Sequence, residues 1–209
     1  MHISEGVLSP QLLAGGAVLA SAGLAIGMRQ LKAEKIPQVA VLSSAFFVGS
    51  LIHVPAGPVS VHLVLNGING LILGWAAFPS IFVALTLQAL LFQFGGLTVL
   101  GVNTVVMAFP AVLSYYVFGR LVRRGSKLTA WAGGFGAGFV SVAVGACLVG
   151  LSLALTGKNF YQAAMVAVAA HIPVMIIEGI ITGFCVTFLR RVRPEILGIK
   201  AESREEDRR

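Results

Sequence analysis

The sequence predicts an all-α, polytopic membrane protein built as a bundle of about seven transmembrane helices. Apolar residues make up 57% of the chain and charged residues only 11%, whereas a soluble domain carries roughly 25% charged residues. The apolar runs approach the length of about 20 residues that a helix needs to cross hydrocarbon. They lack the alternation that is typical of barrel strands. We therefore expect a multi-pass protein of the cell (inner) membrane, surrounded by the lipid bilayer.

Capping residues, prolines and glycines divide the apolar runs into separate helices. Ser9 followed by Pro10 is typical of a helix start, Pro37 opens the second run, and Pro79 separates the third run from the fourth. The glycine-containing stretch 95–104 predicts a turn at the membrane surface. The expected spans cover residues 10–28, 37–53, 59–77, 80–95, 103–119, 128–156 and 160–189.

The net charge of +7 reports membrane topology, so we expect no nucleic-acid partner. Lysine and arginine residues cluster after the first, fifth and seventh expected spans, at 29–35, 120–127 and 190–193. Basic residues favour the cytoplasmic side of a membrane. Seven spans with the N-terminus outside and the C-terminus inside bring all three clusters to that side. Residues 10–193 then form the bundle, residues 1–9 an extracytoplasmic segment, and residues 194–209 a polar cytoplasmic tail.

The first two residues have the chemistry of a metal chelate. The bulky His2 disfavours removal of Met1, so we expect the α-amine of Met1 to be retained. This amine, the backbone nitrogen of His2 and the His2 imidazole can close two small rings around one ion. Such nitrogen-rich tetragonal ligation suits Cu(II) or Ni(II), with Co(II) below them in affinity. The alternative is an exposed, frayed terminus that carries an incidental histidine.

Two further histidines are expected on the same side of the membrane as His2. In the seven-span topology His53 lies at the outer end of the second span and His62 near the outer end of the third. Polar side chains in spans are costly and often functional, which makes His62 a candidate ligand. The alternatives are an interfacial imidazole at His62, bonded to a neighbouring helix, and a headgroup-level side chain at His53.

His171 and Glu178 are expected together inside the last span, seven residues apart and on one helix face. Glu178 is the only carboxylate in any expected span, so it must face the bundle interior or another subunit. This pair supports an alternative function, a proton- or cation-coupled secondary transporter. A purely structural hydrogen bond or ion pair would satisfy the same burial penalty.

Several classes of protein are excluded by absent motifs. The sequence contains no Walker A loop and no His-Glu-x-x-His motif, and no Gly-x-Ser-x-Gly elbow. No nucleophile is paired by spacing with His62 or His171, so we expect no enzyme and no resident cofactor. Cys147 and Cys185 both lie in apolar spans and form neither a disulfide framework nor a zinc motif.

Four segments together resemble the CbiM/NikM family, the substrate-binding membrane components of cobalt and nickel energy-coupling factor (ECF) transporters. The resemblance extends from residue 1 to about 190, and the decapeptide is its most specific part. The segments are residues 1–10 (MHISEGVLSP), 59–63 (VSVHL), 95–104 (GGLTVLGVNT) and 171–179 (HIPVMIIEG).

The resemblance implies the ligands, the cargo and the partners. Its ligand set is Met1 through the α-amine, His2 through its backbone and imidazole nitrogens, and His62 through its imidazole. The transported ion is Co²⁺ or Ni²⁺. The implied partners are a membrane coupling (T) subunit, cytoplasmic ATPase subunits and a small accessory membrane subunit. The residues expected to support the ligands or couple them to the bundle are His53, Ser60, Asn103, His171 and Glu178.

Overall fold

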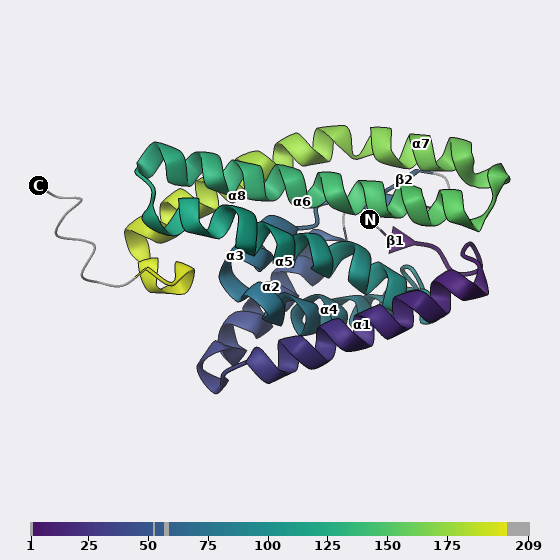
Figure 1. Ribbon diagram of the computed structural model, residues 1–209, viewed down its shortest axis with the longest axis horizontal. Helices are drawn as coiled ribbons and strands as arrows, with labels where there is room; N and C mark the ends of the chain where they lie inside the picture. The colour runs from purple at the N-terminus through teal and green to yellow at the C-terminus, as the bar shows by residue number, and fades with distance from the viewer. Residues whose placement is uncertain (1, 52, 57–58, 200–209) are drawn as a thin grey trace, which may run out of the picture.

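The computed structural model describes residues 2–51, 53–56 and 59–199, and most of these residues are helical. Figure 1 shows long helices running along the molecule, with a small sheet tucked among them. The helices are α1 (Pro10–Gln30), α2 (Ile36–Gly49), α3 (Asn66–Leu73), α4 (Ala77–Phe92), α5 (Leu100–Arg124), α6 (Lys127–Thr156), α7 (Tyr161–Ala170) and α8 (Ile172–Val192). Short 3₁₀ turns at Ala33–Lys35, Gly74–Ala76, Lys158–Phe160 and Pro194–Leu197 join or end them.

Five helical segments in the described part of the chain are long and apolar enough to cross a membrane. They are Pro10–Gln30, Asn66–Phe92, Leu100–Arg124, Lys127–Thr156 and Lys158–Val192. The expectation of a helical membrane bundle is confirmed at this level, although the protein also contains strands and so is not all-helical. The 14-residue α2 spans only about 21 Å at 1.5 Å per residue, so it does not reach across the hydrocarbon core by itself.

A three-stranded antiparallel sheet lies where the sequence predicted helix ends. Its strands are β1 (His2–Ile3), β2 (His53–Ala56) and β3 (Val59–His62), in the order β1-β3-β2. The predicted span 59–77 was therefore wrong at its start, because helix α3 begins only at Asn66. The β-branched residues Val59 and Val61 alternate with polar ones, a pattern that suits a strand better than a helix.

Two prolines have effects that differ from the prediction. Pro79, expected between two spans, is the third residue of α4, where proline is tolerated because a first-turn N–H has no helical partner. The last predicted span is divided at His171 into α7 and α8, with Pro173 in the first turn of α8. The segment is therefore two consecutive helices, and the first of them, α7, contacts β2 and β3.

Glycines allow α3, α6 and α8 to meet closely below the sheet. A Cβ atom on Gly67 would lie 2.6 Å from the Cα of Gly138, and one on Gly138 would lie 2.7 Å from the backbone carbonyl carbon of Glu178. Side chains larger than hydrogen would separate these backbones. The three helices therefore form a tight unit directly beneath the strand that carries His62.

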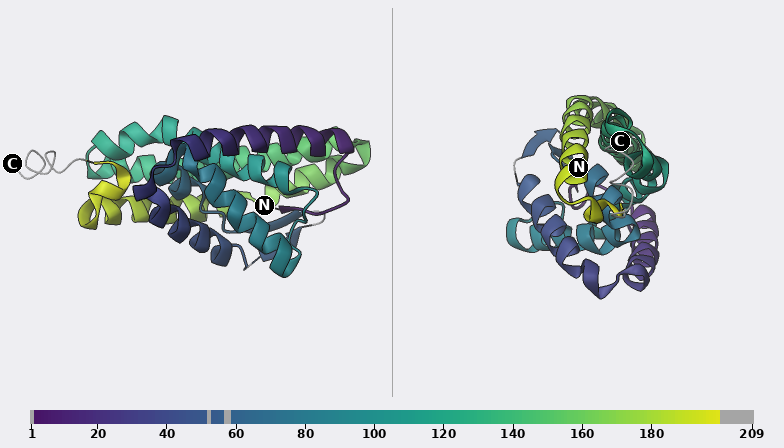
Figure 2. Two further views of the ribbon diagram at one scale, coloured as in Figure 1. Left: turned by 90° about the horizontal axis from the view of Figure 1, so that it is seen from below. Right: turned by 90° about the vertical axis from the view of Figure 1, so that its left-hand side faces the viewer.

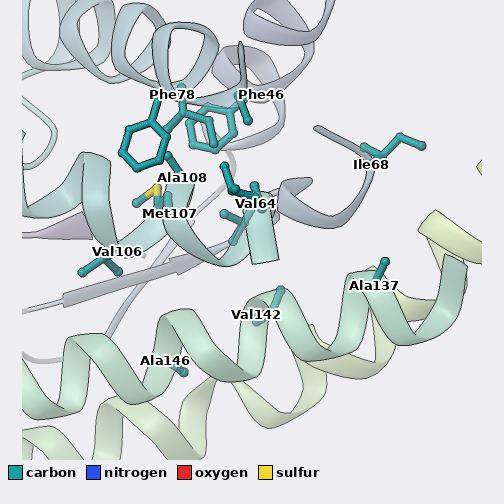
Figure 3. Close-up of a cluster of buried hydrophobic side chains, with 14 of the residues drawn as sticks. Phe46, Val64, Ile68, Phe78, Val106, Met107, Ala108, Ala137, Val142 and Ala146 are labelled. Atoms are coloured by element: carbon teal, nitrogen blue, oxygen red, sulfur yellow. The ribbon is translucent and has the colours of Figure 1, made fainter. Parts of the chain in front are cut away.

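Apolar side chains fill the space between the sheet and the helices. Figure 3 shows Phe46 and Phe78 above Val64, Met107 beside it, and Val142 on helix α6. Phe46 and Met107 are fully buried, and Val64 has no exposed surface. This cluster gives the base of the sheet a rigid apolar support. It fixes the depth at which the chain passes from β3 into α3.

Candidate metal centre

The sheet brings the first residues of the chain against the predicted ligand His62. β1 pairs with β3 in the register His2 to Ser60 and Ile3 to Val59, and β2 pairs with β3 in the register His53 to His62. His2 is 4% exposed and His62 3% exposed, so the terminus is inserted into the protein. The frayed-terminus alternative does not describe this chain.

The two imidazoles face each other through their ring nitrogens. His62 Nε2 lies 3.0 Å from His2 Nδ1, and the ring centroids are 4.6 Å apart. Among the described residues no group of three His, Cys, Asp or Glu side chains surrounds them. A third metal ligand beside these two rings would therefore have to be a group other than a described His, Cys, Asp or Glu side chain. Met1, the first member of the predicted ligand set, lies outside the described residues.

The outer nitrogen of each ring is bonded to an oxygen acceptor. His2 Nε2 lies 2.8 Å from Gln88 Oε1, and His62 Nδ1 lies 2.6 Å from the carbonyl oxygen of Leu63. The Gln88 amide is itself oriented, since its nitrogen donates to the Phe47 carbonyl at 3.2 Å and to the Ser50 hydroxyl. Both outer nitrogens therefore carry the proton of a neutral ring. The two inner nitrogens present lone pairs to each other.

Burial keeps both rings neutral. It lowers the pKa of His2 to about 3 and the pKa of His62 well below the usual histidine value. Neutral imidazole is the form that ligates metals. At neutral pH neither ring needs to lose a proton before a cation arrives.

Asn103 and Glu5 hold the N-terminal segment in place. Asn103 accepts a hydrogen bond from the Ile3 N–H at 3.0 Å and donates one to the Ile3 carbonyl at 3.1 Å. Glu5 accepts from the Thr98 N–H at 3.0 Å, and this bond lowers the pKa of the Glu5 carboxyl. The loop before α5 and the first turn of α5 thus form the dock for β1.

His53 and Ser60, two of the predicted supporting residues, belong to the same sheet. His53 is directly opposite His62 in the β2–β3 register, its Nδ1 lies 3.1 Å from the Leu51 carbonyl, and its ring is edge-on to Phe94. Ser60 is opposite His2. Both residues lie in the sheet that carries the histidine pair. Phe94 lies between the rings of His53 and His2, in contact with His53 and with its ring centroid 6.4 Å from that of His2.

His171 directly precedes α8, and Glu178 lies within this helix. Both residues lie below the sheet and are fully buried. His171 Nδ1 lies 2.6 Å from the Ala167 carbonyl. Glu178 Oε1 accepts from the Val64 N–H at 2.5 Å and from the Leu65 N–H at 2.8 Å. In the described part of the chain His171 Nε2 and Glu178 Oε2 have no hydrogen-bond partner. His171 is near enough to His62 to contribute to the lowered pKa of that ring.

Sequence reasoning missed Gln88 and Glu5. Gln88 is a fully buried polar residue within α4, and a polar side chain in an apolar span was the available signal. Glu5 was quoted as part of the N-terminal decapeptide without a role of its own. Its partner is a backbone N–H more than ninety residues away, which no local pattern indicates.

The chain and its fold match a known family. Residues 2–196 match the family model described as CbiM, the cobalt uptake substrate-specific transmembrane region. The chain belongs to the CbiM family. Membership confirms the expectation of a multi-pass membrane transport component and not an enzyme, with a transition metal ion as its cargo.

Relatives of this CbiM-family chain carry names that refer to metal transport. A putative metal transport protein of Haemophilus influenzae is 45% identical over 94% of this chain and 97% of its own length. A putative fused nickel transport protein, NikMN, of Archaeoglobus fulgidus is 28% identical over 96% of this chain and 69% of its own length. A crystal structure of a transition metal transporter superposes with a TM-score of 0.74 at 28% identity, covering 92% of this chain and 93% of that one.

Proposed function

We propose that this chain is the substrate-capture (S) component of an ATP-driven ECF-type importer for Co²⁺ or Ni²⁺. In this role it binds one ion at the extracytoplasmic N-terminus through the Met1 amine, the backbone and imidazole nitrogens of His2, and the His62 imidazole. The observation that carries the proposal is the close approach of two buried imidazole nitrogens, His62 Nε2 and His2 Nδ1, at 3.0 Å.

The separation of these two nitrogens suits a shared metal ion. An imidazole–metal bond of about 2.0 Å, as on zinc, puts two ligands at right angles about 2.8 Å apart. Neutral imidazole nitrogens are common metal ligands, and a cation bound between these two would be held by both rings. The outer hydrogen bonds to Gln88 and Leu63 fix the ring orientations in the way that partners of metal-bound histidines do.

The distribution of basic residues supports an outside N-terminus and an inside C-terminus. Arg190 Nη1 donates to the carbonyls of Val122 and Gly125 at 3.1 and 2.6 Å, which joins the ends of α5 and α8. One surface pocket is lined by both Lys35 and Arg123, so the loop after α1 lies at this end too. The last described residues, in the turn Pro194–Leu197, also lie at this end, away from the sheet (Figure 2). The positive-inside rule assigns this basic end of the bundle to the cytoplasmic side.

Seven passes of the chain through the bundle fit this orientation. Ser80 Oγ donates to Asn69 Oδ1 at 3.4 Å, although a straight helix would separate these residues by about 16 Å at 1.5 Å per residue. The chain therefore reverses at the turn Gly74–Ala76. α3 and α4 count as two passes, and the first of them is short because α3 has only eight residues.

The proposed partners are a membrane coupling subunit, cytoplasmic ATPase subunits and a small accessory membrane subunit. The sequence has no Walker A loop, so ATP hydrolysis has to be supplied by another chain. The Archaeoglobus relative is described as fused and this chain spans 69% of it, which is consistent with a further component acting beside this one.

The test is metal binding by the purified chain with its native N-terminus, compared with a variant carrying one additional alanine before Met1. Ni(II) and Co(II) are titrated at neutral pH and the bound equivalents are counted. We expect about one ion per native chain and a loss of at least about tenfold in affinity for the extended chain, the lower end of what disturbed metal sites lose.

An alanine added after Arg209 is the matched control, since it lengthens the chain equally at the opposite end. This control should bind like the native chain. Equal binding by both extended chains, or no binding by any of them, would contradict the proposal and favour the secondary transporter that uses His171 and Glu178.

A further inference from the structure

The three residues after His62 form a strap that ties the metal centre to helix α8. The strap, Leu63–Leu65, begins with the carbonyl that bonds His62 Nδ1 at 2.6 Å. Its next two backbone N–H groups both donate to one oxygen of Glu178, at 2.5 Å from Val64 and 2.8 Å from Leu65. One short segment thus links the ring of a proposed ligand to a carboxylate in the bundle.

The strap has a conformation that needs to be held. Leu65 has a φ of 54° in the left-handed region, which side chains other than glycine rarely adopt. It is also the residue before α3, where backbone N–H groups have no helical partner. Glu178 supplies the missing acceptor, and without it two buried donors would be unsatisfied.

Glu178 is itself fixed in position. It is fully buried, and its backbone lies against Gly138 of α6, where a Cβ would come within 2.7 Å of the Glu178 carbonyl carbon. The positive end of the α3 dipole stabilises a carboxylate at this point. The side chain therefore reaches the strap from a closely packed part of α8.

We infer that Glu178 is a positioning residue for metal binding, which sets the orientation of His62 through the Leu63–Leu65 strap. This inference rests on the proposed function, because it assumes that His62 is a ligand. It gives the buried carboxylate a role in capture of the ion. It also makes α8 the helix that is mechanically joined to the occupied site.

The experiment is a double-mutant cycle on Ni(II) affinity, with native N-termini throughout. Glu178→Ala should weaken binding by about 10–100-fold, the usual loss when the partner of a metal-bound histidine is removed. His62→Ala should lose at least as much. The double variant should bind like His62→Ala alone, because a residue that acts through His62 has nothing to position once the imidazole is gone.

Two single variants complete the design. Glu178→Gln keeps an oxygen that can accept both strap hydrogen bonds, so it should lose less affinity than Glu178→Ala. Thr182→Val is the matched control: Thr182 is buried one turn further along the same face of α8, and its hydroxyl has no partner in the described part of the chain. Its affinity should stay within about twofold of the native value, the range of a change without lost contacts.

The outcomes separate the inference from the proposed function. Native affinity in Glu178→Ala, or a further loss when Glu178→Ala is added to His62→Ala, overturns the positioning role. If the native chain binds no Ni(II), the proposed function fails first, and the inference fails with it. If Glu178→Ala does not fold, Glu178→Gln decides through the same cycle, in which its loss must also vanish beside His62→Ala.

Discussion

One asparagine side chain, that of Asn103, helps to hold β1 in the sheet. Asn103 satisfies both the N–H and the carbonyl of Ile3, whose side chain is fully buried. A β1 strand of only two residues cannot hold itself by ladder hydrogen bonds alone. At the scale of single residues the metal centre therefore depends on side chains that need never touch the ion.

Replacing Asn103 with leucine should weaken Ni(II) binding. The change leaves two buried backbone groups of Ile3 without partners, at about 1–3 kcal/mol each, and about 1.4 kcal/mol corresponds to tenfold in affinity. We expect at least about a tenfold loss in a titration of the purified protein. Thr104→Val is the control, since it removes only a hydrogen bond to the Leu100 carbonyl within α5. Similar affinities in the two variants would refute the role of Asn103.

The sequence was sufficient to predict His2 and His62 as partners, and Asn103 as a supporting residue. The family resemblance carried that information, since His2 lies in its segment 1–10, His62 in 59–63 and Asn103 in 95–104. Gln88 was not predictable in the same way, because its role depends on α4 passing behind His2, eighty-six residues along the chain. Met1 remains a prediction, since it lies outside the described residues.

At the scale of elements, glycine contacts set how closely the helices approach. The backbone of α3 at Gly67 rests on α6 at Gly138, and Gly70 packs against the Ala111 carbonyl of α5. These contacts bring α3 under the sheet, where its first turn receives the strap. Hydrophobic patterning predicted most of the helices, but it misassigned residues 59–62, because an alternation of only four residues is too short to separate a strand from the start of a helix.

Gly67→Ala should destabilise the bundle, whereas Gly15→Ala should not. A Cβ on Gly67 would meet the Gly138 backbone at 2.6 Å, and such overpacking costs about 1–3 kcal/mol. Gly15 in α1 has no atom within 4 Å of the added Cβ, so alanine there gains up to about 1 kcal/mol of helix propensity. Thermal unfolding of the purified proteins in detergent should give a lower midpoint for Gly67→Ala only. An unchanged midpoint would mean that α3 and α6 are not closely packed.

At the scale of the whole molecule, the sheet and the basic residues lie toward opposite ends. Figure 1 shows β1 in the half of the bundle away from the last described residues, which follow α8, with α6 running along both halves. α6 has 30 residues, or about 45 Å at 1.5 Å per residue, which exceeds the hydrocarbon thickness of about 30 Å. Its two ends are therefore suited to report on the two sides of the membrane.

Single cysteines at the ends of α6 test the proposed orientation. Lys127 and Lys158 flank this helix and are both exposed. In a background with Cys147 and Cys185 replaced by alanine, a membrane-impermeant maleimide added to intact cells should label Lys158→Cys and not Lys127→Cys. Both should react after the membrane is permeabilised. Labelling of Lys127→Cys alone in intact cells would reverse the orientation.

The N-terminal strand also determines when the protein can mature during synthesis. Ile3 can form its hydrogen bonds only after Asn103, one hundred positions later, has been synthesised, and Glu5 only after Thr98. At about 5–20 residues per second, the ribosome needs about 5 to 20 seconds to deliver these partners. The N-terminal segment is synthesised first, but it can form these hydrogen bonds only late. The proposed metal centre therefore cannot be complete until α5 has been synthesised.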